Sequence, residues 1–153
     1  MAHDDDIIGI PSIEPEIEAF IRKQGVARLA TADGEGRPSL VPVCFVFTEG
    51  RFYSPIDDKR KNTSWGRLKR LRNIEVNPNV CLLLDHYSRD WTELRWVLIR
   101  GVAEVISPPD RFAKEHAEAI RLLRRKYPQY ENARIGERPL IRIVPRSVTS
   151  WSA

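Results

Sequence analysis

Residues 26–47 read VARLATADGEGRPSLVPVCFVF and describe two strands around a tight turn. The segments 26–32 and 37–47 are rich in apolar residues, and they flank the sequence DGEG at 33–36. Paired glycines supply the positive-φ positions that a hairpin turn needs. The sequence therefore predicts that the first two strands are antiparallel.

The rest of the chain continues this β-rich pattern. Pro15 near a helix start and Gly25 just past its end delimit a first helix. Further elements are predicted as strands at 51–55, 80–87, 94–106 and 139–144, a short helix that ends at Asn77-Pro78, and a longer helix that starts at Pro108-Pro109 and ends before Tyr127-Pro128. Six or more mostly antiparallel strands with helices at the ends and sides predict a mainly β fold, a small β-barrel with flanking helices.

Length and composition fit one globular domain. The chain has 153 residues, of which we expect 1–12 to form a loose tail and 13–153 to form the domain. A net charge of +4 favours anionic partners over cationic ones. The longest apolar runs are strand-sized and no charged-then-apolar leader is present, which predicts no membrane span and a cytoplasmic location. Cys44 and Cys81 lie in predicted strands and fit reduced core thiols.

Both faces of the second predicted strand are apolar. Val41, Val43 and Phe45 point one way, while Leu40 and Cys44 point the other way. A barrel interior buries one face, and the outer face of so small a protein needs a partner, most simply a second copy. The pattern therefore predicts a homodimer.

Two groups of residues form a candidate binding site. The first is a flat, backbone-lined wall for a planar ring, made by Pro42, Val43 and Cys44 on the second strand with Ser54, Pro55 and Ile56 on the third. Proline lacks the N–H that a central ladder uses, so Pro42 belongs at an edge, a bulge or a ligand contact. The alternative for these wall residues is plain barrel core.

The second group is a dense run of cations after the third strand. Seven of them occur within fourteen positions: Lys59, Arg60, Lys61, Arg67, Lys69, Arg70 and Arg72. A charge run is commonly a solvated face. Here the run joins a buried strand to a helix that must dock, which favours an anion site at the strand end.

Other classes of site lack support in the sequence. The three histidines have no metal-ligand spacing, and neither a hydrolytic triad, a GxGxxG fingerprint nor a P-loop is present. Nucleic-acid binding is disfavoured because Trp65 is the one aromatic within the basic run.

Several motifs together resemble a known family. They are GRPSLVPV at 36–43, FYSPID at 52–57, RLRNIEVNPNV at 70–80 and a tryptophan near the C-terminus. In order and spacing they look like the split-barrel proteins related to pyridoxamine 5′-phosphate oxidase. DDKRKN at 57–62 and LLLDHYSRDW at 82–91 are similar to the actinobacterial flavin/deazaflavin oxidoreductases of that superfamily. The resemblance covers Ile17 to Trp151.

The resemblance implies an FMN-binding split barrel that works as a homodimer with a small-molecule substrate. It implies coenzyme F420, with FMN as the alternative, and hydride transfer between the reduced deazaflavin and an electron-poor organic compound. Arg70 matches the family's phosphate-binding position and Asn73 its neighbouring asparagine, while Lys59 and Lys61 add charge nearby. Trp151 would cover the ring from the other subunit.

No catalytic side chain is assigned, because the cofactor carries the chemistry. Three alternatives stay open at this point. They are an FMN-dependent oxidase or reductase, a non-enzymatic flavin or haem carrier, and a basic nucleic-acid-binding barrel.

Overall fold

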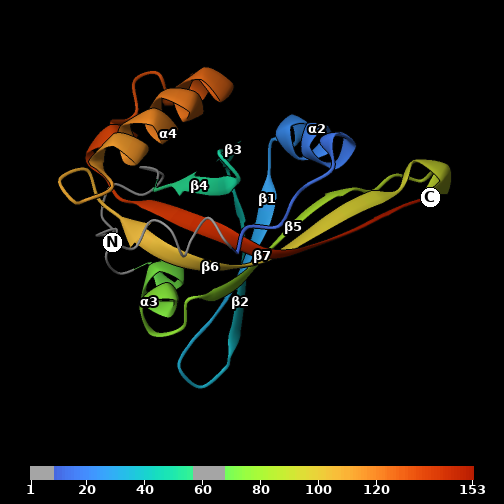
Figure 1. Cartoon of the computed structure of the whole chain (residues 1–153), viewed down its shortest axis with the longest axis horizontal. Coiled ribbons are helices and arrows are strands. Elements are labelled where there is room, and N and C mark those ends of the chain that lie inside the picture. The colour runs from blue at the N-terminus through green and yellow to red at the C-terminus, as the bar shows by residue number, and fades with distance from the viewer. Residues whose placement is uncertain (1–8, 57–67) are drawn as a thin grey trace.

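The computed structural model describes residues 9–56 and 68–153. It is mainly β, and one seven-stranded antiparallel sheet curls into a half-barrel with three α-helices around it (Figure 1). The helices are α2 (Pro15–Lys23), α3 (Lys69–Val76) and α4 (Ala113–Lys126). The strands are β1 (Ala27–Ala32), β2 (Pro38–Val43), β3 (Val46–Thr48), β4 (Arg51–Pro55), β5 (Asn79–His86), β6 (Arg95–Ile106) and β7 (Leu140–Ser152). The predicted split-barrel fold class is confirmed.

The order of the strands opens the barrel on one side. Across the sheet it is β2-β1-β5-β6-β7-β4-β3, and every ladder is antiparallel. Strands β2 and β3 follow each other in the chain but lie at opposite edges of the sheet. The chain therefore crosses from one edge to the other within Cys44 and Phe45.

The prediction of one continuous strand over 37–47 is wrong, because side chains of α4 and its end replace the ladder at this crossing. The Tyr127 hydroxyl accepts a hydrogen bond from Phe45 N at 3.1 Å and lies 3.0 Å from Phe45 O. Lys126 Nζ also donates to Phe45 O, at 3.0 Å. The backbone of Phe45 is thus satisfied without a neighbouring strand.

Two hydrophobic clusters hold the sheet. The barrel interior contains Leu29, Leu82 and Ile99, which face one another across β1, β5 and β6 and are fully buried. Helix α3 adds Leu71 and Ile74 to this interior cluster, as its apolar stripe predicts. A second cluster lies between α4 and the other side of β3 and β4.

Two boundaries differ from the sequence prediction by more than two residues. Helix α4 begins at Ala113 and not at Pro108-Pro109, because the Asp110 carboxylate accepts hydrogen bonds from Ser107 N and Phe112 N and holds a turn there. Strand β7 continues to Ser152, well past the predicted end at Val144, because β6 pairs with it along its whole length.

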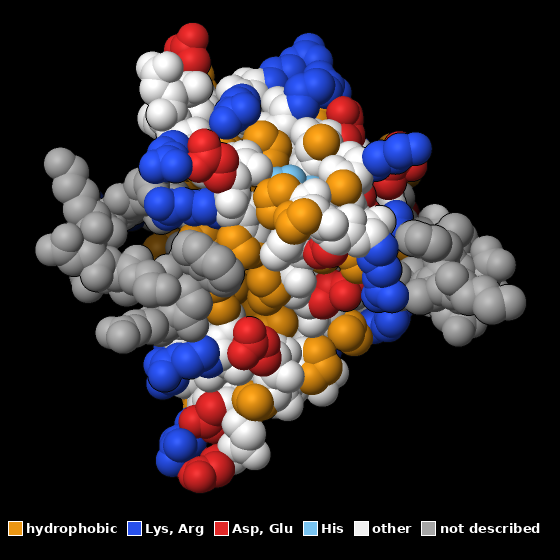
Figure 2. Space-filling model, turned by 90° about the vertical axis from the view of Figure 1, so that its left-hand side faces the viewer, with side chains coloured by type: hydrophobic (Ala, Val, Ile, Leu, Met, Phe, Trp, Pro, Cys, Tyr) orange, Lys and Arg blue, Asp and Glu red, His pale blue; other side chains and the backbone are white. Residues whose placement is uncertain are grey.

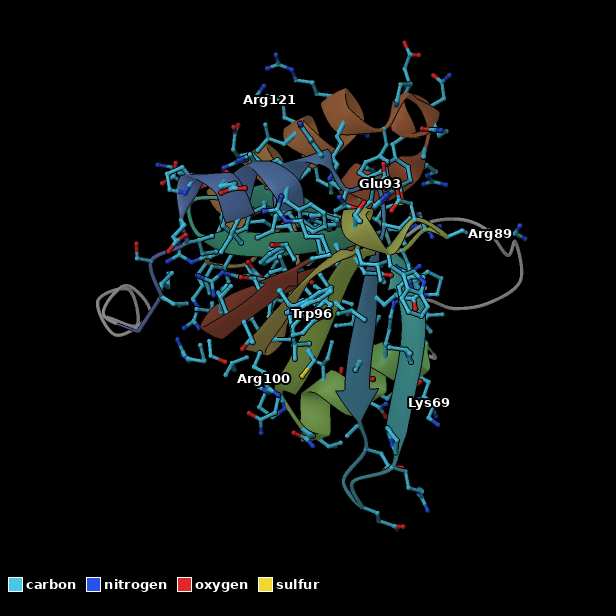
Figure 3. All side chains as sticks on the ribbon, turned by 90° about the vertical axis from the view of Figure 1, so that its right-hand side faces the viewer. Lys69, Arg89, Glu93, Trp96, Arg100 and Arg121 are labelled. Carbon is cyan, nitrogen blue, oxygen red and sulfur yellow. The ribbon has the colours of Figure 1, made fainter. Side chains whose placement is uncertain are left out.

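The outer face of the sheet carries apolar side chains that residues 9–56 and 68–153 leave partly uncovered. Leu83, Leu98 and Cys81 are half-buried there, and Leu40 is 66% exposed. Trp96 lies over the same face (Figure 3) and pairs across the ladder with Trp151. Within the described ranges, no helix is long and apolar enough to span a membrane.

Candidate functional site

A cavity of about 390 Å³ lies where the two edges of the sheet come together. Five residues of the predicted site line it, and they come from β2, the crossing, β4 and α3. Among the residues that the structure describes, the lining is Val26, Pro42, Val43, Cys44, Pro55, Arg70 and Tyr130. The structure thus joins the predicted backbone wall to one of the predicted cations. This volume is in the range of small-molecule sites in proteins.

The order of the strands places the residues of the predicted wall. Strand β2 is an edge strand, so Pro42 sits where the absent N–H costs no central ladder bond, as predicted. The β3–β4 ladder covers Val46–Thr48 against Arg51–Tyr53, so Ser54 and Pro55 extend beyond its end. The ends of two strands, at Val43 and Pro55, therefore line the cavity together.

Arg70 supplies the charge of the cavity. It is the second residue of α3 and half-buried, whereas its neighbour Lys69 is exposed (Figure 3). The first turn of α3 has three basic residues, Lys69, Arg70 and Arg72, with no acidic residue and no side-chain cap. The partial positive charge at a helix N-terminus disfavours cations and attracts anions. The cations of this turn are therefore unfavourable for α3 itself, and an anion at this position would offset their charge.

Three predicted site residues lie behind the wall. Ser54 of β4 and Ile56, which directly follows β4, are both buried. They point to the same side as Phe52, which faces the barrel interior. Asn73 is buried under α3, where its Nδ2 donates to Thr31 Oγ1 at 3.0 Å. These side chains support the wall and the helix, and they do not line the cavity.

The remaining predicted residues lie elsewhere. Trp151 is 46% exposed near the end of β7, on the arm that carries the C-terminus away from α3 and α4 (Figure 1). It does not line the cavity of its own chain. Lys59 and Lys61 lie outside the described residues.

Val26 and Tyr130 line the cavity but were not predicted from the sequence. Val26 directly precedes β1, and Tyr130 ends the short 3₁₀ turn Pro128–Tyr130 after α4. The rings of Tyr127 and Tyr130 lie 5.5 Å apart. The cluster of aromatic residues at 127–130 after a helix was the available signal.

A buried polar network fixes β4 beneath the cavity. The Tyr53 hydroxyl donates to the Glu115 carboxylate of α4, and Arg142 Nε donates to the same carboxylate at 2.8 Å. Arg142 Nη1 also donates to Glu104 at 2.9 Å. Burial and the bond to Glu115 raise the pKa of Tyr53 well above its usual value, so the phenol stays protonated and keeps donating.

The side chains of the cavity can bind a ligand, by apolar contact and by one positive charge. The described side chains that line it are apolar apart from the Arg70 guanidinium, the Cys44 thiol and the Tyr130 phenol. Among residues 9–56 and 68–153, no group of His, Cys, Asp or Glu is placed to hold a metal ion. On the side of the molecule that carries α3 and α4, hydrophobic side chains gather in a central band with Lys and Arg along its margins (Figure 2).

Comparison with known proteins assigns these features to a family. The model described as pyridoxamine 5′-phosphate oxidase matches residues 13–152. The chain is 32% identical to the 5a,11a-dehydrotetracycline/5a,11a-dehydrooxytetracycline reductase of Streptomyces rimosus, over 93% of this chain and 84% of the relative. It is 30% identical to the haem oxygenase HutZ of Vibrio cholerae, over 58% of this chain and 44% of that protein.

Solved structures share the fold. A conserved hypothetical protein from Mycobacterium tuberculosis aligns with a TM-score of 0.73 and 22% identity, over 94% of this chain and 87% of that chain. A structure named as an F420 reductase aligns with a TM-score of 0.64 and 19% identity, over 90% of this chain and 98% of the other.

Proposed function

Because this chain belongs to the pyridoxamine 5′-phosphate oxidase family, we propose that it is an oxidoreductase whose cavity binds a phosphate-bearing, flavin-type cofactor. The observation that carries the proposal is that Pro42, Val43 and Pro55 line the same cavity as Arg70, which lies in the first turn of α3. The ring of the cofactor needs an apolar surface, and its phosphate needs a positive charge.

The residues fit such a cofactor. Pro42, Val43 and Pro55 offer an apolar surface for one face of a planar ring. Arg70 has a guanidinium fork that can hold phosphate oxygens in a bidentate manner, with the amides of the α3 N-terminus beside it. Asn73 keeps α3 on the sheet through Thr31 and so positions Arg70.

We infer coenzyme F420 rather than FMN as the cofactor. The motif resemblance to the deazaflavin branch supports this choice, as do a reductase among the relatives and an F420 reductase among the proteins of the same fold. When bound, a reduced deazaflavin supplies a hydride to an electron-poor substrate such as a quinone or a conjugated enone. The chain's own part is to orient the ring, to bind the phosphate and to exclude water from the apolar wall.

We propose that the protein acts as a homodimer whose seam lies on the outer face of the sheet. Leu83 and Leu98 sit side by side on that face and are half-buried, with Leu40 largely exposed nearby. Covering this apolar surface would stabilise the pair by the hydrophobic effect. Trp151, which does not reach the cavity of its own chain, would then cover the partner's ring.

A cytoplasmic location remains a prediction. Its support is that Cys44 and Cys81 are both free thiols, as expected in a reducing compartment.

Haem binding is a second candidate, favoured by the partial match to HutZ. A hydride-transfer assay separates the two functions. Reduced F420 is mixed with the purified protein and a soluble quinone, and the oxidation of the deazaflavin is followed by its absorbance. We expect quinone-dependent oxidation that needs the protein. If neither reduced F420 nor reduced FMN is oxidised faster with the protein than without it, across quinone and enone acceptors, the proposed reaction is wrong.

A further inference from the structure

A second cavity, of about 370 Å³, lies between α2 and α4 above β3. Both helices stand on the same side of the sheet, with β3 between them (Figure 1). The cavity is lined by Arg22 of α2, by Val46 and Phe47 of β3, and by Leu122, Arg125 and Lys126 of α4. Three cations thus surround a floor of apolar side chains.

The cations in this cleft are only partly neutralised. Arg22 forms an ion pair with Glu18 at 2.6 Å and also donates to Phe47 O at 2.6 Å, which fixes its position. Within the described part of the chain, no ion pair joins Arg125 or Lys126 to a carboxylate. The cleft therefore keeps a net positive charge.

Lys126 is the most constrained of the three. Its Nζ lies 3.0 Å from Phe45 O and 3.8 Å from the centroid of the Phe45 ring. Burial and the nearby charge of Arg22 lower the pKa of this amine to about 8, while Cys44 opposes the shift. A desolvated ammonium next to another cation is unfavourable unless an anion joins it.

We propose that this cleft is a binding site for an organic anion with an apolar body, of the class of medium-chain carboxylates. The carboxylate is held by Lys126 and Arg125, and the apolar body lies on Val46, Phe47 and Leu122. Charge complementarity and the apolar floor together select this class over inorganic anions and over neutral amphiphiles.

The site is distinct from the proposed cofactor cavity and does not rest on it. Cys44 lines one cavity and Val46 the other, so the crossing between β2 and β3 separates them. The charged and titratable groups that face the Lys126 amine are Arg22 from α2, the Cys44 thiol at the crossing, and Arg125 and Tyr127 from the end of α4.

Calorimetric titration of the full-length, cofactor-free protein with octanoate tests the proposal. Acetate is the control that lacks the apolar chain, and 1-octanol is the control that lacks the negative charge. Burial of two methylene groups alone is worth about a tenfold gain in affinity, so we expect octanoate to bind at least about tenfold more tightly than acetate. Equal binding of octanoate and acetate, or of octanoate and 1-octanol, would overturn the proposal, as would no binding.

The matched variants are Lys126→Met and Lys114→Met, which change the same residue type on the same helix. Lys114 is exposed and does not line the cleft. Loss of a charge-assisted hydrogen bond weakens binding by about ten- to a hundredfold, so we expect that loss for Lys126→Met and less than about a twofold change for Lys114→Met. Similar affinities of the two variants contradict the proposal.

Proton linkage in the unmodified protein gives a test that no variant can confound by misfolding. A bound carboxylate raises the pKa of the Lys126 amine above about 8, so binding near pH 8 takes up protons and binding near pH 6 does not. Titrations in two buffers of different ionisation enthalpy measure this uptake. Octanoate binding with no proton uptake near pH 8 would place the ligand elsewhere.

Discussion

Replacement of Arg70 by alanine should weaken cofactor binding by about ten- to a hundredfold. The guanidinium is half-buried on the cavity wall at the first turn of α3, where a phosphate would accept a charge-assisted hydrogen bond from it. Such a bond is worth roughly 1.5 to 3 kcal/mol, and every 1.4 kcal/mol is about a tenfold change in affinity. Alanine also preserves the helix, since it has the highest helix propensity.

The assay is a fluorescence titration of F420 into each protein at one fixed ionic strength, with circular dichroism to verify the fold. Lys69→Ala is the control, because Lys69 is adjacent to Arg70 on α3, lies about 100° around the helix and is exposed. It removes the same charge from the same helix terminus without touching the cavity. If both substitutions weaken binding equally and slightly, the basic residues form only a solvated face and the phosphate site is wrong.

Two further predictions test the seam and the sheet. Light scattering at micromolar concentration should show a dimer of the unmodified protein. Leu98→Asp should convert it to a monomer of 17.7 kDa, because a charge would otherwise be buried at the dimer interface. A monomeric unmodified protein would refute the proposed interface. Gly101→Ala should lower the free energy of unfolding by about 1 to 3 kcal/mol, because the added Cβ would lie 2.6 Å from Val144 O of the neighbouring strand. A melting temperature unchanged in differential scanning calorimetry would contradict that close approach of β6 and β7.

Local sequence signals predicted most elements of the fold. The DGEG turn and the apolar segments on either side specify the β1–β2 hairpin, and the strand at Arg51–Pro55 has the predicted bounds. The stripe of α3 docks on the interior as expected. These features depend on neighbours within a few residues, which is the range that periodicity reports.

The features that depend on distant residues could not be predicted. Apolar character continues without interruption from Val41 to Phe47, and the break between β2 and β3 comes from Tyr127 and Lys126, about eighty residues further along the chain. The end of β7 is polar, and only its pairing with β6 makes it a strand.

Some residues of the candidate site could also be predicted from the sequence, and others could not. The wall at Pro42–Cys44 and the cation Arg70 were predicted from motifs and then found on one cavity. Asn73 carries the motif but is buried, and it donates a hydrogen bond to Thr31 instead of lining the cavity. Tyr130 belongs to an aromatic cluster at 127–130 whose place beside the cavity depends on the folded chain.

The most direct test of the central claim is a parallel titration of the purified protein with F420, FMN and haem, followed by fluorescence for the flavins and by absorbance for haem. We predict saturable binding of F420, weaker binding of FMN, and a loss of F420 affinity in Arg70→Ala that Lys69→Ala does not share. Tight binding of haem with no measurable affinity for F420 or FMN would contradict the account.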